Sequence, residues 1–147
     1  MRDAEIYEAN RADLVRYTAV LVGPHDAEDV VSTVMLRVLE RRRLDDLEDA
    51  RAYLFRAVLN ECRSRVTRAR AALGSADVSV PPPTDPQPEV LAAVMGLPVR
   101  QRAATYLVYW SDQSVAETAR LMATRPGTVK RYLHPARRKL KGVLDGD

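Results

Sequence analysis

The 147-residue chain is poor in cysteine, histidine and glycine, and these shortages exclude several classes of protein. Its single cysteine, Cys62, cannot form an internal disulfide and lies on an apolar face of a predicted helix, which favours a packed thiol over a reactive one. The sequence has only two histidines, no glycine-rich phosphate-binding loop and no nucleophile motif. We therefore expect no catalytic residues, no resident cofactor and no enzymatic activity.

Long apolar runs are also missing. No segment approaches the ~18 consecutive apolar residues that a membrane-spanning helix needs. The N-terminal residues MRDAEIYEAN lack the apolar centre of a signal peptide. The sequence therefore predicts a cytoplasmic protein without membrane insertion.

Acidic residues are absent from one long stretch near the C-terminus. Residues 118–144 contain eight Lys or Arg and no Asp or Glu. In contrast, residues 1–71 contain 13 Arg and 13 acidic residues, so the net charge of +3 conceals a strongly basic C-terminal part. A one-sided positive field attracts polyphosphates and makes their binding salt-dependent. We expect this part to bind nucleic acid.

The same stretch has the pattern of a helix-turn-helix. Ser114 and Glu117 form an S-x-x-E capping box, which predicts a helix that begins directly after Ser114. A turn at residues 122–124 follows, and Pro126 suits the first turn of a second, basic helix. Such a pair of helices places the second one in the DNA major groove. The alternative is an amphipathic hairpin with a solvated basic face.

A proline-rich segment divides the sequence, with five prolines within residues 81–88. It predicts a semi-rigid linker that could span about 50 Å at ~3.1 Å per residue. On both sides of it, apolar residues recur at helical spacings, and no alternating pattern is longer than residues 76–80. We expect an all-α fold in which residues 1–71 and 89–147 form two small helical domains joined by residues 72–88.

Three helices are expected in the first domain. The first ends at Gly23-Pro24, the second has Asp26 as its N-cap and ends at the basic residues 41–43, and the third begins near Ala50. The third helix carries an apolar stripe at intervals of four residues, formed by Leu54, Val58, Cys62 and Val66.

Three segments carry the motifs of a known family. They are HDAEDVVSTVMLRVLE at residues 25–40, ARAYLFRAVLNECRSRV at 50–66 and LPVRQRAATYLVYWSDQSVAETARLMATRPGTVKRYLHPARRKL at 97–140. In this order they resemble the extracytoplasmic-function (ECF) sigma factors of bacterial RNA polymerase, in the sigma-70 superfamily. The resemblance implies an alternative sigma factor that binds core RNA polymerase and directs promoter-specific transcription initiation.

The resemblance implies a role for each domain. Residues 1–71 correspond to sigma region 2, which binds the clamp helices of the largest polymerase subunit and opens the −10 promoter element. Residues 89–147 correspond to region 4, which reads the −35 element and packs on the β flap. Promoter DNA and core polymerase are thus the implied partners, and an anti-sigma factor is a further candidate.

Region 2 of the family assigns roles to two groups of positions. The core-polymerase-binding positions are Asp26, Glu28, Asp29, Ser32 and Met35. The family often has Gln, Glu and Phe where this chain has Ser32, Thr33 and Met35, so this interface is expected to be altered. The positions that handle the −10 strand are Tyr53, Phe55, Arg56, Asn60 and Arg63. Melted bases need aromatic faces to stack on and cations near the backbone, although Tyr53 and Phe55 would equally suit a helical core.

Region 4 assigns the −35 contacts to the second helix of the helix-turn-helix. They are Arg125, Thr128, Lys130, Arg131, His134, Arg137 and Arg138. Arginine can pair bidentately with guanine, and Lys or Thr can contact phosphate or base edges.

The sequence of region 4 differs from the usual pattern of the family at two places. Ala123 and Thr124 replace the usual Gly and aliphatic residue of the turn. Pro135 stands where the family usually places a base, and a proline costs about 3 kcal/mol in a helix interior because it cannot donate to the carbonyl four residues earlier. We expect the helix either to kink near Arg131 or to end there, with a new helix beginning at Pro135.

Two other functions are compatible with parts of the sequence. His25 and Asp29 lie one turn apart and, with the neighbouring acids, could be drawn as metal ligands. A helix start explains these acids equally well through the helix dipole, so no metal site is expected. The second alternative is a sigma-like DNA-binding regulator or adaptor that binds an anti-sigma factor without directing initiation.

Overall fold

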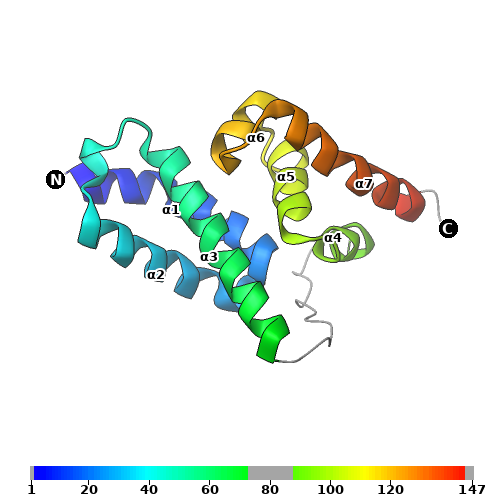
Figure 1. The fold of residues 1–147 in the computed structure, drawn as a ribbon, viewed down its shortest axis with the longest axis horizontal. Helices are drawn as coiled ribbons and strands as arrows, with labels where there is room; N and C mark the ends of the chain where they lie inside the picture. Colours follow the sequence, from blue (N-terminus) through cyan, green and yellow to red (C-terminus); the bar gives the residue numbers. More distant parts are fainter. Residues whose placement is uncertain (1, 73–87, 145–147) are drawn as a thin grey trace.

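The computed structural model describes residues 2–72 and 88–144, and all regular structure within these ranges is helical (Figure 1). The all-α prediction is therefore confirmed. All but the two end residues of the expected linker lie outside the described part. The helices are α1 (Arg2–Val22), α2 (Pro24–Arg41), the 3₁₀ helix η1 (Leu44–Asp46), α3 (Ala50–Ala72), α4 (Pro88–Met95), α5 (Val99–Tyr109), α6 (Val115–Met122) and α7 (Pro126–Leu144).

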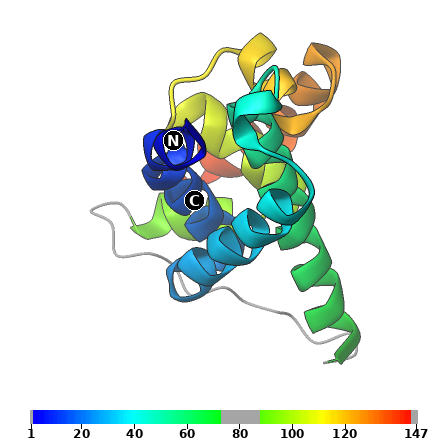
Figure 2. The same cartoon turned by 90° about the vertical axis from the view of Figure 1, so that its left-hand side faces the viewer.

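The first three α-helices pack together, and the C-terminal end of α3 projects beyond α1 and α2 (Figures 1 and 2). Leu54, Val58 and Cys62 of the predicted stripe are fully buried, whereas Val66 is half-buried where α3 begins to leave the bundle. Burial raises the pKa of the Cys62 thiol to about 12, which keeps it protonated and unreactive. Among the described helices, none combines the length and apolar character that crossing a membrane requires.

The start of α2 differs from the prediction. Gly23 has a φ of 98°, a conformation that glycine adopts without strain, and α2 begins immediately afterwards at Pro24. Asp26 is therefore not the N-cap but lies inside the first turn. Its carboxylate still interacts favourably with the positive end of the helix dipole there.

The helix-turn-helix prediction is confirmed. The Ser114 hydroxyl accepts a hydrogen bond of 3.0 Å from the Glu117 backbone N–H, and α6 begins at the next residue after Ser114. The Glu117 side chain does not complete the capping box but pairs with Arg120. After the turn, α7 begins at Pro126, as expected.

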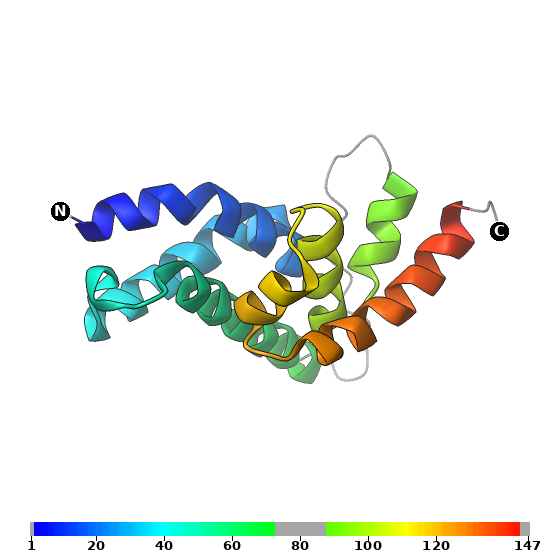
Figure 3. The ribbon, with the colours of Figure 1, turned by 90° about the horizontal axis from the view of Figure 1, so that it is seen from above.

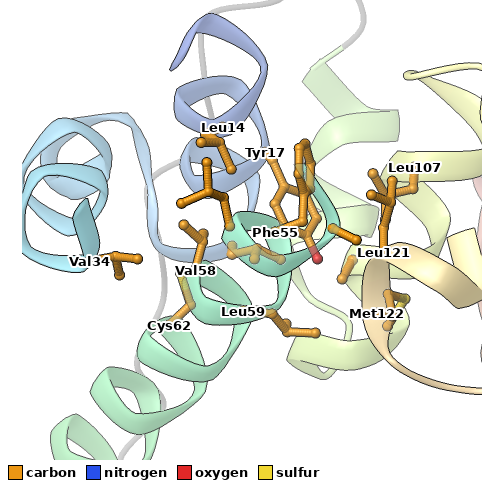
Figure 4. Packing of buried hydrophobic residues seen from close by; sticks show 14 of the residues in the cluster. Leu14, Tyr17, Val34, Phe55, Val58, Leu59, Cys62, Leu107, Leu121 and Met122 are labelled. Carbon is orange, nitrogen blue, oxygen red and sulfur yellow. The ribbon is translucent and has the colours of Figure 1, made fainter. Parts of the chain in front are cut away.

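The two groups of helices share a continuous apolar core. Helix α6 packs against α3, and α5 packs against α1 (Figure 3). The Tyr17 ring of α1 lies 5.0 Å from the Phe55 ring of α3 and 6.1 Å from the Tyr106 ring of α5, centroid to centroid. Figure 4 shows Tyr17 and Phe55 between the apolar residues of α3 and those of α5 and α6. The expected linker at residues 72–88 therefore separates two helical segments of the sequence, but the two segments share one apolar core.

The turn between α6 and α7 generates a stability prediction. Ala123 adopts a left-handed conformation with φ 55° and ψ 47°, which is strained for a residue with a Cβ atom. Ala123→Gly should therefore raise the free energy of unfolding by about 0.5–1 kcal/mol, measured by urea denaturation. Ala116→Gly, at an exposed position inside α6, should lower it by a similar amount. An equal loss of stability in both variants would contradict the strain at Ala123.

Candidate nucleic-acid interface

The predicted −35 residues lie on the outer side of α7. Val129, Leu133 and Ala136 are fully buried and form its inner side. Thr128 is half-buried, and its hydroxyl accepts a 3.2 Å hydrogen bond from Arg131, one turn further along. This contact orients the Arg131 guanidinium along the helix surface. The remaining predicted side chains that lie exposed on α7 or just before it are Arg125, Lys130, Arg131, His134 and Arg138.

Arg137 differs from the other predicted −35 residues. Its Nε donates a 2.5 Å hydrogen bond to the Tyr109 hydroxyl, and its guanidinium carbon lies 5.9 Å from the centre of the Tyr109 ring. Arg137 is therefore held against the end of α5 in this arrangement.

Helix α7 continues through Pro135 to Leu144. Of the two expected outcomes, a new helix that begins at Pro135 is therefore excluded, and a kink near Arg131 stays a prediction. Packing downstream explains the continuity: Ala136 is fully buried, and Leu140 contacts the apolar cluster of Val20, Val94 and Met95. Pro135 itself is exposed, so its ring points away from this packing.

The predicted −10 residues of α3 fall into two groups. Asn60 and Arg63 are exposed and, with Ser64, Thr67 and Arg68, line a shallow hollow on the outer half of α3. Tyr53 is half-buried beneath the Arg42 guanidinium, whose carbon lies 5.5 Å from the ring centre. Asn60, Arg63 and Tyr53 are therefore all at least partly accessible to solvent.

Phe55 and Arg56 are already engaged by the protein. Phe55 is only 2% exposed and packs on Tyr17, so it is a core residue here and cannot stack on a base. The Arg56 guanidinium donates two hydrogen bonds, of 3.0 and 2.7 Å, to the backbone carbonyl of Arg120 at the end of α6. Of the two roles considered for Phe55, the structure selects packing.

The predicted core-binding positions all lie on α2, and all but one of them are exposed. Asp26, Glu28, Asp29 and Ser32 are exposed. Met35 is only 5% exposed, which contradicts its expected place at the interface. Instead, Leu36 and Leu39 project from α2 with 66% and 45% exposure. The helical period could have revealed this, because Val31, Val34 and Val38 occupy the inner side and leave positions 36 and 39 outside.

Sequence reasoning also missed Glu61, the single acid among the six arginines of α3. It is 7% exposed and accepts hydrogen bonds from Arg37 (2.6 Å), Arg65 (2.8 Å) and Arg68 (3.4 Å). Burial raises the pKa of Glu61, but the hydrogen bonds from Arg65 and Arg37 outweigh burial and the net pKa is lowered. Because Arg37 belongs to α2, the cluster ties the candidate polymerase-binding helix to the candidate DNA-handling helix.

The acids at the start of α2 also pair with arginines. Glu28 lies 3.3 Å from Arg11, and Asp29 lies 3.0 Å from Arg65. Within residues 2–72 and 88–144, no three His, Cys, Asp or Glu side chains are grouped so that they could hold a metal ion. The alternative of a metal site near His25 thus has no support in the described part of the chain.

Comparison with known families agrees with this geometry. The family models "Sigma-70 region 2" and "Sigma-70, region 4" match residues 6–72 and 88–140, respectively. The ECF RNA polymerase sigma factor SigL of Mycobacterium tuberculosis is 33% identical over 153 residues, covering 95% of the chain and 86% of that relative. The chain belongs to the ECF sigma factors. Its helix-turn-helix lies within the match to region 4, and α1–α3 lie within the match to region 2.

Other relatives of this sigma factor are similarly distant. SigM of M. tuberculosis is 35% identical over 128 residues, and the chain spans only 64% of SigM's length. The RNA polymerase sigma-E factor of Streptomyces coelicolor is 32% identical, with coverage of 95% and 85% of the two chains.

Two solved structures share the fold of this sigma factor. One is the sigma factor RpoE of Bartonella quintana in complex with the anti-sigma factor NepR, with a TM-score of 0.76, 21% identity and coverage of 98% and 97% of the two chains. The other is CnrH in complex with the cytosolic domain of CnrY, with a TM-score of 0.67, 22% identity and coverage of 98% and 88%.

The Glu61 cluster generates a prediction for stability against pH. The folded-state pKa of Glu61 lies below its ordinary value of 4.5, so its contribution is fully present above pH ~4.5 and is lost as the pH falls through the folded pKa. Glu61→Gln should lower the free energy of unfolding by ~1–3 kcal/mol at pH 7, and this difference should shrink below pH ~4.5. Chemical denaturation at several pH values measures it.

Glu48→Gln is the control for Glu61→Gln, because Glu48 is an exposed glutamate before α3. It should leave the unfolding free energy within ~0.5 kcal/mol of the parent chain. A Glu61→Gln deficit that stays constant from pH 7 to pH 3 would contradict the assigned ionisation.

Pro135 generates a prediction for DNA affinity. The family's base is missing at this exposed position, so Pro135→Arg should tighten −35 binding and steepen the dependence of log K on log salt by ~0.9, the effect of about one more phosphate contact. Pro135→Ala is the matched control, because it restores the backbone N–H without adding charge. Titrations of a −35 duplex at several salt concentrations measure both slopes. Equal slopes in the two variants would mean that position 135 points away from the DNA.

Proposed function

We propose that the protein is an alternative sigma factor of the bacterial cytoplasm that binds core RNA polymerase and directs initiation at specific promoters. The observation that carries this proposal is the combination, in one chain, of a region 2 bundle with a basic region 4 helix-turn-helix. A simple repressor needs only the second of these two parts.

In this function, the outer side of α2 would bind the clamp helices of the polymerase. Its exposed acids and Ser32 would meet polar groups, while Leu36 and Leu39 would bury apolar surface that the free protein exposes to water. Exposed apolar side chains beside charged ones are typical of a docking surface. Region 4 would pack on the β flap, as the family does.

In the same function, α3 and α7 would bind the promoter DNA. Tyr53 offers a ring for an unpaired base, and Asn60 and Arg63 offer donors for the backbone of the −10 strand. Arg56 would join them only by releasing the Arg120 carbonyl. On α7, Arg131 is the candidate for base readout in the −35 element. The other basic side chains of α7 would contact phosphates and set affinity and salt dependence.

A regulator or adaptor without initiation activity is the second candidate. It is favoured by the divergent Ser32 and Thr33 of α2, where a weakened polymerase interface would leave DNA binding intact. The solved RpoE structure is a complex with an anti-sigma factor, and an anti-sigma partner for this chain fits either candidate. Core-polymerase binding separates the two candidates.

Transcription in vitro with purified core polymerase on a genomic promoter library tests the proposed function. The protein should co-elute with core enzyme and yield transcripts from a specific subset of promoters. Failure to co-elute at both low and physiological salt would eliminate the initiation factor and leave the regulator.

Titrations of −35 duplexes at several salt concentrations test the readout by α7. Arg131→Ala should cost ~1–3 kcal/mol and relax the sequence preference at one −35 position if Arg131 contacts a base. Arg138→Ala, the control for a phosphate contact, should weaken binding uniformly and reduce the salt slope. A uniform loss in Arg131→Ala would assign Arg131 to phosphate instead.

A further inference from the structure

A cationic groove lies between α3, the start of α5 and α7. Its volume is about 330 Å³, which lies at the lower end of the ~300–1,000 Å³ typical of small-molecule sites. Three exposed arginines line it, Arg63 and Arg70 from α3 and Arg100 from α5, and none of the described residues that line it is acidic. Apart from Arg63, these residues have no part in the function proposed above.

Helix α3 presents its share of the groove in one row. Arg63, Thr67 and Arg70 are four and three residues apart, so they lie on one side of the helix, and all three are exposed. Arg102 of α5 lies behind this row, buried, and donates a 2.6 Å hydrogen bond to the Leu21 carbonyl of α1. Burial lowers the pKa of Arg102, and the nearby charge of Arg70 lowers it further. Like charges thus gather on this side of α3, and a bound anion would neutralise them.

Helices α5 and α7 complete the groove. Arg100 lies in the first turn of α5, where the positive end of the helix dipole adds to its charge. It donates a 3.5 Å hydrogen bond to the hydroxyl of Tyr132, which is half-buried on α7. Val66 and Val99 add apolar surface to the lining. The groove therefore combines donors for phosphate groups with an aromatic and apolar surface for a planar ring.

We propose that this groove binds a free nucleotide, with its phosphates on Arg63, Arg70 and Arg100 and its base against Tyr132. Guanidinium groups suit phosphates because their fork of donors can pair with two oxygens at once. Any base can stack on an aromatic ring, and the Gln101 amide, which also lines the groove, can both donate to and accept from a base edge. The site does not depend on the proposed function, because it needs neither promoter nor polymerase.

Calorimetric titration of the full chain with ADP, pyrophosphate and adenosine tests the site. Pyrophosphate lacks the base, so ADP should bind about tenfold more tightly than pyrophosphate if the base stacks in the groove. Adenosine lacks the phosphates, so ADP should also bind about tenfold or more tightly than adenosine. Both comparisons matter, because a bare cationic patch would bind pyrophosphate as well as ADP.

A matched pair of charge variants locates the binding. Arg100→Gln removes one groove cation without touching the residues proposed for the promoter, and it should weaken ADP binding about tenfold. Arg43→Gln makes the same change at an exposed arginine directly before η1, outside the groove. It should leave the affinity for ADP within about twofold of the parent chain.

Two variants of Tyr132 separate its ring from its hydroxyl. Tyr132→Phe keeps the ring and should bind ADP within about twofold of the parent chain, whereas Tyr132→Leu loses the ring and should bind about fivefold or more weakly. Circular dichroism shows whether each variant keeps its helical signal. Equal ADP affinities in two folded variants would contradict the stacking of the base on Tyr132.

A DNA strand that crosses the groove would offer the same phosphate chemistry as a free nucleotide. A single-stranded −10 oligonucleotide distinguishes these two sources. Its proposed contacts are Tyr53, Asn60 and Arg63, so Arg100→Gln should change its affinity by no more than about twofold. An equal loss of affinity for ADP and for the oligonucleotide would instead assign the groove to DNA and overturn the nucleotide site.

Three further results would overturn the proposal. They are no binding of ADP, binding of ADP no tighter than that of pyrophosphate, and an unchanged ADP affinity in Arg100→Gln. Transcription with core polymerase reads the proposed function separately. A chain that binds ADP but directs no transcription would keep the nucleotide site and lose the initiation factor.

Discussion

The packing of α6 on α3 is the contact on which the rest of the arrangement depends. Helix α3 fills the region 2 core with Phe55 and Val58 and carries on its other side the polar residues that we propose for DNA. Helix α6 covers part of the surface between these two sides. Whatever binds α3 must therefore compete with α6 or use the outer half of α3, which projects from the bundle.

Ion pairs and hydrogen bonds allow α3 to carry many arginines and still pack against its neighbours. Six arginines on α3 would repel one another, but Glu61 holds Arg65 and Arg68 on one side, and Arg56 is held by a backbone carbonyl on another. The cost of burying Glu61 is offset because its carboxylate accepts three charge-assisted hydrogen bonds. Arg63 and Arg70 face outward, and we propose Arg63 for the −10 strand. The same logic holds on α7, where Tyr109 holds Arg137 while its neighbours face solvent.

The elements that follow from local chemistry were predicted well. The Ser114 cap, the start of α7 at Pro126 and the stripe through Cys62 depend on residues within a turn or two of one another. One local prediction failed, because Gly23 and Pro24 begin α2 before Asp26. The other failures involve residues that are distant in the sequence. Met35 is buried because the valines of α2 turn that side of the helix inward. Helix α7 passes through Pro135 because Leu140 packs on the apolar cluster of Val20, Val94 and Met95.

By itself, the sequence determined the helices, the basic helix-turn-helix and the family, because capping, helical period and motif order are all encoded locally. Only the tertiary structure decided that Phe55 packs in the core, that Glu61 organises the arginines, and that Arg56 and Arg102 join the two groups of helices. The physical reason is that a backbone carbonyl at a helix end can accept from any donor brought near it. A carbonyl carries no signature in the sequence, so its partner emerges only when the helices are placed side by side.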